Sequence, residues 1–138
     1  MQCYNPNRLE AETAVNSPKD ANPEILANKL GSMINAEFII ITLGEDGVLL
    51  FSDGNVDIFP AVNSEVYDVT GAGDSLISAM ALGIAATKGD MKTSIILGNY
   101  AAGVAVRKIG TASVSSDELK NLIDYDYRIK TSEISSAI

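Results

Sequence analysis

The distribution of apolar and polar residues predicts two helices in the first third of the chain. Residues 8–15 follow an Asn-Pro-Asn turn, and Asn7 with Glu10 three residues later has the pattern of a helix capping box. Residues 23–34 begin with proline, which suits the first position of a helix. Their apolar residues share one helical face: Ile25, Leu26, Leu30, Met33 and Ile34. A short strand is expected at residues 1–4, directly before the turn.

Apolar residues become continuous in the next part of the chain, and this predicts strands. Residues 37–43 (Glu-Phe-Ile-Ile-Ile-Thr-Leu) form a β-branched run, as expected of a strand buried on both faces of a parallel sheet. A turn bounded by glycines at residues 44–47 leads into a second strand at 48–52, so the pattern is typical of a hairpin. An Asp-Gly-Asn turn then precedes a third short strand at 56–60.

The second half of the chain is predicted to be helical. One helix follows the Gly-Ala-Gly sequence and ends near residue 87, a second spans 91–109, and a serine at 115 or 116 caps a third. The helix at 91–109 is rich in small residues: Gly98, Ala101, Ala102, Gly103 and Ala105. Small residues allow the close approach of either a neighbouring helix or a flat ligand, and composition favours helix packing. Residues 128–138 have few apolar anchors and are expected to form a flexible tail.

This order of elements predicts an α/β fold in which helices are layered on a sheet of roughly three to five strands. The chain has 138 residues, which is enough for one compact domain. Residues 1–127 are assigned to that domain and residues 128–138 to the tail. Because the strands are few and the chain starts within a strand-to-helix unit, we expect the rear portion of a larger domain.

The composition restricts the chemistry. The net charge of −8 argues against a nucleic-acid partner, which requires a basic surface, but a phosphorylated ligand can still bind through helix N-termini and metal ions. The chain has one cysteine, Cys3, and no histidine, so an internal disulfide, a Cys/His zinc site and a histidine-based triad are excluded. The longest strongly apolar run, residues 38–43, is too short to span a membrane, and the N-terminus has no apolar signal core. A cytoplasmic protein is therefore expected.

The strongest candidate chemistry lies in residues 66–75. Gly71, Ala72 and Gly73 precede the predicted helix, and Asp74 lies in its first turn. Backbone N–H groups at a helix start are unpaired and carry a partial positive charge, so they can bind an anion. A carboxylate in this position can accept a proton from a docked molecule. Two alternatives involve no ligand: the glycines can serve the packing of a helix on a strand, and Asp74 can be an acid that the helix dipole favours.

Four segments resemble the ribokinase-like, or PfkB, family of carbohydrate kinases. Residues 68–75 (Asp-Val-Thr-Gly-Ala-Gly-Asp-Ser) are similar to the family signature, and residues 7–10 match its Asn-x-x-Glu motif. Residues 41–47 resemble the strand and turn beside the nucleotide, and residues 99–112 also fit the family. Within the family, residues 108–115 are similar to the end of the heptose-7-phosphate kinase domain of ADP-heptose synthesis. The segments have the family's order over nearly the whole chain, which implies the C-terminal, nucleotide-binding half of a ribokinase-like layered α/β/α domain.

The resemblance implies transfer of a phosphoryl group from ATP to a hydroxyl of a sugar or sugar phosphate, with Mg²⁺ and, as in many relatives, a monovalent cation such as K⁺. Asp74 would deprotonate the sugar hydroxyl, and the backbone N–H groups of Gly71, Ala72 and Gly73 would form an anion hole for the transferring phosphoryl group. The residues implied to contact the nucleotide are Asn7, Thr42, Gly44, Gly47, Asn99, Ala102 and Gly103. The implied cation ligands are Asn7 and Glu10 for Mg²⁺, and Asp68 and Thr70 for the monovalent cation.

Two features of the family have no counterpart in this sequence. They are the glycine-rich segment that grips the sugar and the small β lid that closes over it, so the sugar-binding residues are expected to lie outside this chain. The nucleotidyltransferase domain that often follows a heptose kinase domain is also absent. Two alternatives to a kinase stay open: a nucleotide-binding module without catalytic activity, and a fold remnant without a ligand. A truncated sheet would expose an edge and an apolar face, so self-association into a homo-oligomer is expected.

Overall fold

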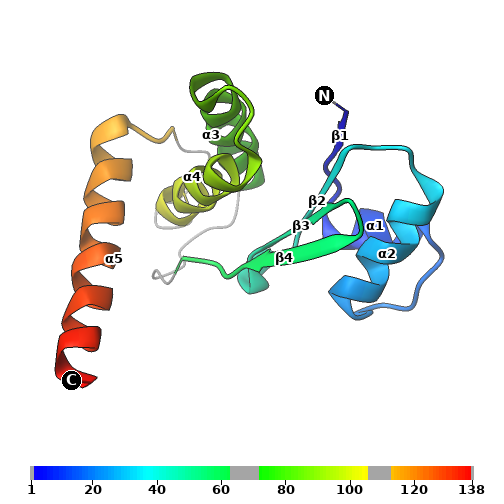
Figure 1. Ribbon diagram of the computed structural model, residues 1–138, viewed down its shortest axis with the longest axis horizontal. Coiled ribbons are helices and arrows are strands. Elements are labelled where there is room, and N and C mark those ends of the chain that lie inside the picture. Colours follow the sequence, from blue (N-terminus) through cyan, green and yellow to red (C-terminus); the bar gives the residue numbers. More distant parts are fainter. Residues whose placement is uncertain (1, 63–71, 106–112, 138) are drawn as a thin grey trace. The chain divides into compact units, whose positions relative to one another are not determined.

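The computed structural model describes residues 2–62, 72–105 and 113–137 (Figure 1). The chain divides into two compact units, Met1–Ala61 and Val62–Ile138, and each is described by itself. Within the described residues, the first unit contains strands and helices, whereas the second contains helices alone. The predicted α/β class is confirmed.

A four-stranded sheet with the order β1-β2-β3-β4 forms the centre of the first unit. β1 (Cys3–Tyr4) pairs in parallel with β2 (Phe38–Thr42), whereas β3 (Val48–Ser52) and β4 (Asn55–Phe59) continue the sheet in antiparallel fashion. The predicted hairpin of β2 and β3 is therefore confirmed, and the parallel pairing expected of β2 is found on its other side, with β1. The connection from β2 to β3, residues 43–47, is too short for the crossover that parallel pairing requires.

Two helices cover one face of this sheet. They are α1 (Arg8–Ala14), which was predicted from its capping pattern, and α2 (Pro23–Met33), which was predicted from its first proline and its apolar face. The core that the helices share with the strands consists of Ala11, Leu26, Ala27, Leu30, Ile39, Ile41, Leu43 and Leu49. Ile40, which points to the opposite face of β2, is also fully buried, so β2 is buried on both faces as predicted. Each fully buried aliphatic side chain of this kind stabilises the fold by about 1.5–3 kcal/mol.

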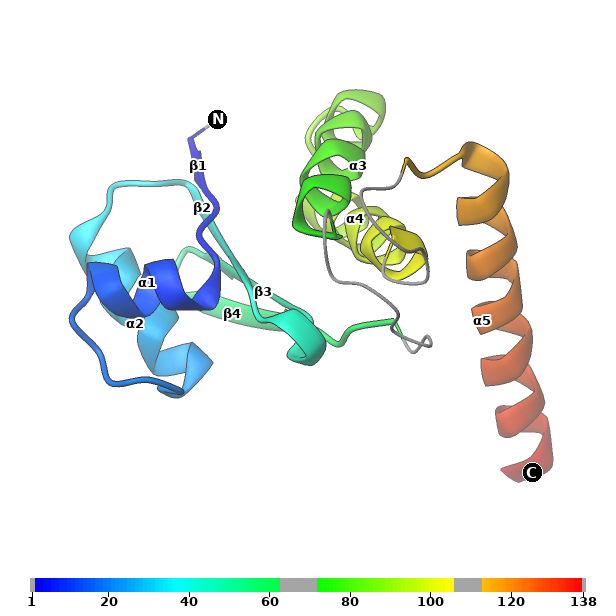
Figure 2. The same ribbon diagram turned by 180° about the vertical axis from the view of Figure 1, so that it is seen from behind.

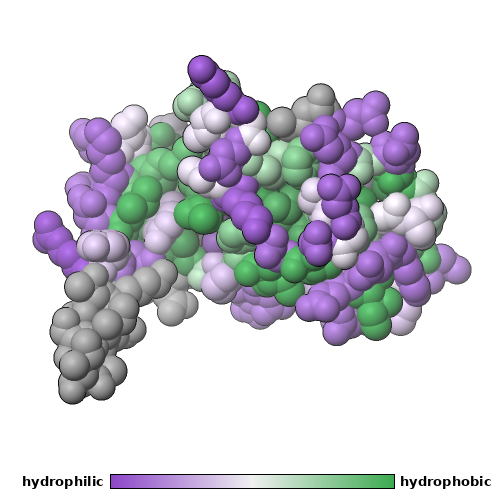
Figure 3. Space-filling view, viewed as in Figure 1, coloured by the Kyte–Doolittle hydropathy of each residue, from purple (hydrophilic) through white to green (hydrophobic). Residues whose placement is uncertain are grey.

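The buried face of α2 differs from the predicted one. Leu26 and Leu30 are fully buried, but Ile25 is 56% exposed and Met33 is 62% exposed. Ile25 and Met33 share a helical stripe with the exposed Lys29, since the three residues are spaced four apart. Polar and apolar side chains are accordingly interspersed over α1 and α2 in the space-filling view (Figure 3).

The turn between β2 and β3 requires glycine at one position for steric reasons. Backbone hydrogen bonds close this turn, from Leu43 N to Gly47 O at 2.8 Å and from Gly47 N to Gly44 O at 3.1 Å. Gly47 has a φ of +98°, and a Cβ atom there would lie 2.0 Å from the carbonyl oxygen of Phe59. Any side chain at this position would therefore push the end of β4 away from the turn.

We expect Gly47→Ala to lower the free energy of unfolding by clearly more than the roughly 1–2 kcal/mol that a left-handed backbone alone costs. Gly54→Ala is the matched control, because Gly54 has a φ of +76° but no atom lies within 4 Å of an added Cβ. Urea unfolding followed by circular dichroism measures both losses. Equal losses in the two variants would contradict the steric role of Gly47.

Two helices of the second unit pack very closely (Figure 2). They are α3 (Ala72–Thr87) and α4 (Met91–Ala105). A Cβ atom at Gly98 of α4 would lie 2.7 Å from the carbonyl oxygen of Leu76 of α3. The interpretation of the small residues of α4 as helix-packing residues is therefore confirmed at Gly98. The predicted extension of this helix to residue 109 lies outside the described residues.

The last helix, α5 (Ser116–Ala137), is longer than the sequence pattern predicted. Ser115 caps it, since its Oγ accepts a hydrogen bond from Glu118 N at 3.2 Å, and the Glu118 carboxylate accepts one from Ser115 N at 2.9 Å. The backbone beyond residue 128, expected as a flexible tail, continues as helix to Ala137. The segment contains neither glycine nor proline, so nothing in it ends the helix. No helix of the described residues is both long and apolar enough to cross a membrane.

Candidate functional site

The end of β2 and the start of α1 lie next to each other in the first unit. The backbone N–H of Thr42 donates to the carbonyl oxygen of Pro6 at 3.1 Å, and Asn7 forms an isolated parallel bridge with Thr42. These contacts extend the parallel pairing of β1 and β2 past the carboxyl ends of the strands, which is the edge where α/β proteins bind ligands. The structure thus brings together three of the predicted nucleotide residues: Asn7, Thr42 and, in the turn that follows, Gly44.

Asn7 and Glu10 form a complete capping box at this edge. Asn7 Oδ1 accepts a hydrogen bond from Glu10 N at 2.8 Å, and Glu10 Oε2 accepts one from Asn7 N at 2.8 Å. The cap interpretation is therefore confirmed. The side-chain nitrogen of Asn7, Nδ2, and the second carboxylate oxygen of Glu10, Oε1, take no part in these bonds. Because both side chains are exposed, a ligand can reach these atoms without breaking the cap.

The oxygen atoms at the cap are compatible with a magnesium ion that is bound mostly by water and phosphate oxygens. Amide and carboxylate oxygens are hard ligands of the kind that Mg²⁺ prefers. Among the residues that the structure describes, no group of three or more His, Cys, Asp or Glu side chains could hold a metal. A Mg²⁺ ion beside Asn7 and Glu10 would therefore take most of its ligands from water and phosphate oxygens.

An open cleft of about 490 Å³ lies at the start of α3 in the second unit. Asp74 lies in the first turn of α3, is exposed, and lines this cleft together with Ser75 and Ser78. Parts of α4 and the start of α5 form the other walls. A Cβ atom at Gly73 would have no atom within 4 Å, so the backbone at this helix start is open to a ligand. An anion could approach the unpaired N–H groups here with a carboxylate close by.

The residues of α4 that were predicted to contact the nucleotide do not line this cleft. Asn99 and Ala102 are half-buried. A Cβ atom at Gly103 would lie 3.1 Å from Val62 Cβ and 3.4 Å from Leu122 Cδ2. Glycine at position 103 thus has a packing reason that is independent of any ligand, as Gly47 has in the first unit.

Three predicted site residues, Asp68, Thr70 and Gly71, lie outside the described residues. Ala72 is described by its backbone alone, as the first residue of α3. The roles assigned to these four residues stay predictions.

The structure adds two polar residues that the sequence analysis did not single out. Ser78 lies one helical turn beyond Asp74 and lines the same cleft. Arg8 forms an ion pair with Glu12, with 3.3 Å between Nε and Oε1. Ser78 follows Asp74 by four residues, and Glu12 follows Arg8 by four residues. Residues four apart lie on the same face of a helix, so this spacing was the signal in the sequence for both pairs.

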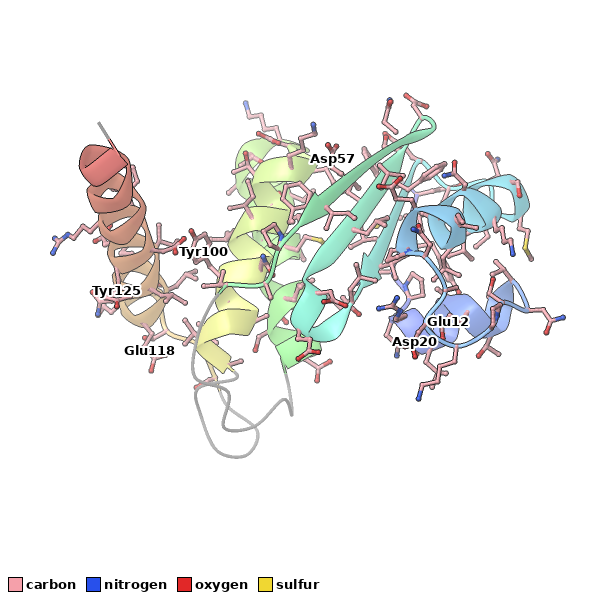
Figure 4. The ribbon with its side chains drawn as sticks, turned by 90° about the horizontal axis from the view of Figure 1, so that it is seen from below. Glu12, Asp20, Asp57, Tyr100, Glu118 and Tyr125 are labelled. Atoms are coloured by element: carbon pink, nitrogen blue, oxygen red, sulfur yellow. The ribbon has the colours of Figure 1, made fainter. Side chains whose placement is uncertain are left out.

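A tyrosine beside Asn99 connects α4 to α5 (Figure 4). The hydroxyl of Tyr100 donates a hydrogen bond to the Asp126 carboxylate. Partial burial, and then the hydrogen bond to Asp126 and its negative charge, raise the pKa of Tyr100 to about 12 from an ordinary value of 10.0. A raised pKa means that folding favours the protonated phenol. The stabilisation is therefore fully present below pH 10 and is lost as the pH rises toward 12.

We expect the ultraviolet titration of tyrosinate in the wild-type chain to contain one late component that Tyr100→Phe removes. The wild type should also lose stability between pH 10 and 12 in a way that Tyr100→Phe does not. Tyr125→Phe is the matched control on α5, because Tyr125 is 61% exposed. If the late component persisted in Tyr100→Phe, the assignment of this pKa to Tyr100 would be wrong.

Comparison with known proteins identifies the family. Residues 3–118 match the model of the pfkB family of carbohydrate kinases. The chain therefore belongs to this family, which confirms the resemblance seen in its motifs.

The curated relatives are considerably longer than this chain. The bifunctional protein HldE of Campylobacter curvus is 37% identical over 138 residues, which cover 93% of this chain and 29% of the relative. The bifunctional protein HldE of Desulfatibacillum aliphaticivorans is 45% identical over 121 residues, which cover 86% of this chain and 24% of the relative. The chain thus spans less than a third of the length of these relatives.

Solved structures show the same fold. A ribokinase from Thermotoga maritima matches with a TM-score of 0.77 at 24% identity, over 90% of this chain and 42% of that protein. An Arabidopsis thaliana ribokinase complexed with ribose and ATP matches with a TM-score of 0.78 at 20% identity, over 88% of this chain and 40% of that protein. Phosphofructokinase-2 from Escherichia coli in complex with potassium matches with a TM-score of 0.77 at 23% identity, over 91% of this chain and 41% of that protein. The prediction of a partial ribokinase-like fold is confirmed.

Proposed function

We propose that this chain carries the nucleotide-binding and phosphoryl-transferring part of an ATP-dependent kinase that phosphorylates a hydroxyl of a sugar phosphate, with a heptose 7-phosphate as the expected substrate. The observation that carries the proposal is the position of Asp74, which is exposed in the first turn of α3, lines an open cleft and lies within the pfkB match. The similarity to HldE proteins supports the heptose substrate.

Asp74 is the general base in this proposal. Its carboxylate takes the proton of the attacking sugar hydroxyl, and the hydroxyl oxygen then displaces ADP from the γ-phosphorus of ATP. The backbone N–H groups of Gly71, Ala72 and Gly73 donate hydrogen bonds to the oxygens of the transferring phosphoryl group. A single preorganised donor of this kind typically contributes about 3–4 kcal/mol to the transition state.

The polar edge of the first unit binds the nucleotide phosphates in this proposal. Asn7 and Glu10 hold phosphate oxygens and the water ligands of Mg²⁺, and Thr42 and Gly44 lie along the nucleotide. A bound Mg²⁺ ion would neutralise charge on the phosphates. The proposal also keeps Asn99 and Ala102 near the adenine, and assigns a monovalent cation such as K⁺ to Asp68 and Thr70. Support for the roles of Asn7, Glu10, Thr42 and Gly44 is the joint position of the cap and the end of β2.

Asp74→Asn is expected to reduce the turnover number by roughly 10²–10⁴ and to leave the affinity for Mg·ATP within about twofold of the wild type, because it removes the base and keeps the shape. The measurements are ADP formation with Mg·ATP and heptose 7-phosphate in the full-length context, and calorimetric titration with Mg·ATP. Asp117→Asn is the matched control, since Asp117 is an exposed acid in the first turn of α5. Wild-type turnover in Asp74→Asn would overturn the assignment of the base.

The same titration separates the kinase from the alternative. Binding of Mg·ATP without turnover of any sugar phosphate in the full-length context would favour a nucleotide-binding module that lacks catalytic activity. No binding at millimolar nucleotide would count against both functions.

Two substitutions at Asn7 separate its cap role from its proposed ligand role. Asn7→Ser keeps a good cap residue, so the free energy of unfolding should change by only a few tenths of a kcal/mol, whereas Asn7→Ala should lose about 1 kcal/mol. Both variants lack the amide and should bind Mg·ATP more weakly. Urea unfolding and calorimetry provide the two measurements. If Asn7→Ser bound Mg·ATP as tightly as the wild type, Asn7 would be a cap residue alone.

A further inference from the structure

The guanidinium group of Arg8 connects three segments of the first unit. Arg8 is the first residue of α1, and it donates hydrogen bonds to Ala21 O at 2.9 Å, Glu12 Oε1 at 3.3 Å and Asp46 Oδ2 at 3.4 Å. These partners belong to the loop before α2, to α1 itself and to the 3₁₀ turn Gly44–Asp46 that follows β2. Arginine carries five donors in a planar fork, so one side chain can hold three segments in fixed relative positions.

A buried carboxylate sets the orientation of Arg8. Glu12 is only 5% exposed, and a buried carboxylate needs a charged or hydrogen-bonding partner. Arg8 supplies that partner from one helical turn away, on the side of α1 where Figure 4 labels Glu12 near the loop that carries Asp20. The Arg8–Glu12 pair therefore fixes the guanidinium at the place where it meets Asp46.

We infer that Arg8 is a positioning residue that holds the Gly44–Asp46 turn beside the α1 cap, and through the turn orders the nucleotide-binding edge. The inference rests on the proposed function, in which Asn7 and Gly44 contact the same nucleotide. The backbone joins the start of α1 to β2 at Thr42, before the turn begins. The Arg8–Asp46 ion pair ties the turn itself to α1, across 38 residues of sequence.

The direction in which Asp46→Asn changes the affinity for Mg·ATP separates a positioning role from charge repulsion alone. The Asp46 side chain is 66% exposed, and a carboxylate beside a triphosphate repels it. Without a positional role, Asp46→Asn would therefore tighten Mg·ATP binding, whereas positioning predicts weaker binding. A guanidinium that bound phosphate directly would lose Mg·ATP affinity in Arg8→Lys but not in Asp46→Asn. Positioning of the turn predicts similar losses of Mg·ATP affinity in both variants.

The experiment is calorimetric titration of the wild type, Asp46→Asn, Arg8→Lys and the double variant with Mg·ATP and with adenosine. Both single variants should bind Mg·ATP about two- to fivefold more weakly, the range that an exposed ion pair can account for, and should bind adenosine as the wild type does. The double variant should be no weaker than Arg8→Lys, because the two substitutions break one contact. Glu45→Gln is the matched control, since it removes the same charge from the adjacent exposed position of the turn and should bind at least as well as the wild type.

Tighter or unchanged Mg·ATP binding by Asp46→Asn would overturn the inference and leave the proposed function intact. Absence of Mg·ATP binding by the wild type would count against the proposed function, and hydrogen exchange of the ligand-free chain then decides the role of Arg8. The amide of Gly47, bonded to Gly44 O at 3.1 Å, should exchange faster in Asp46→Asn than in Glu45→Gln. Equal exchange rates in these two variants would overturn the inference.

Discussion

The hydrogen bond from the Thr42 N–H to the Pro6 carbonyl is the constraint on which the polar edge of the first unit depends. β1 and β2 pair through only two registered positions, and this bond carries their parallel register past the ends of the strands. It places the capping box of α1 against the last residue of β2. A slip of one residue would exchange the two faces of β2, both of which are packed, so the core of the sheet and the position of the cap are maintained together.

The second unit depends on a different kind of constraint, the absence of side-chain volume. Gly98 lets the backbones of α3 and α4 approach until a methyl group would not fit between them. This contact holds α3 at Leu76 and leaves its first turn open, where Asp74 lines the cleft. Rigid packing along a helix combined with an accessible N-terminus is a suitable arrangement for binding an anion, because the N–H groups are already oriented before the ligand arrives.

Local signals in the sequence predicted most of the secondary structure, since caps, prolines and glycine turns act within a few residues. They predicted α1, α2, the hairpin and the start of α5. Errors arose where the outcome depends on distant residues. The exposure of Ile25 and the partners of Arg8 at Ala21 and Asp46 follow from tertiary packing. The motifs predicted the family and the fold, which the comparisons confirm. The joint position of Asn7 and Thr42 required the register of β1 and β2, which no local pattern contains.

The glycines of the turn after β2 have a consequence for the divergence of this family. A side chain at position 47 would collide with the backbone after β4, whereas a Cβ atom at position 44 would meet no atom within 4 Å. Selection for folding alone is therefore sufficient to retain glycine at position 47, even in descendants that have lost their ligand. Position 44 is under a weaker steric restriction, because only its left-handed backbone favours glycine. Under the proposed contact between Gly44 and the nucleotide, loss of glycine at position 44 among distant relatives would thus accompany loss of nucleotide binding more closely than any change at position 47.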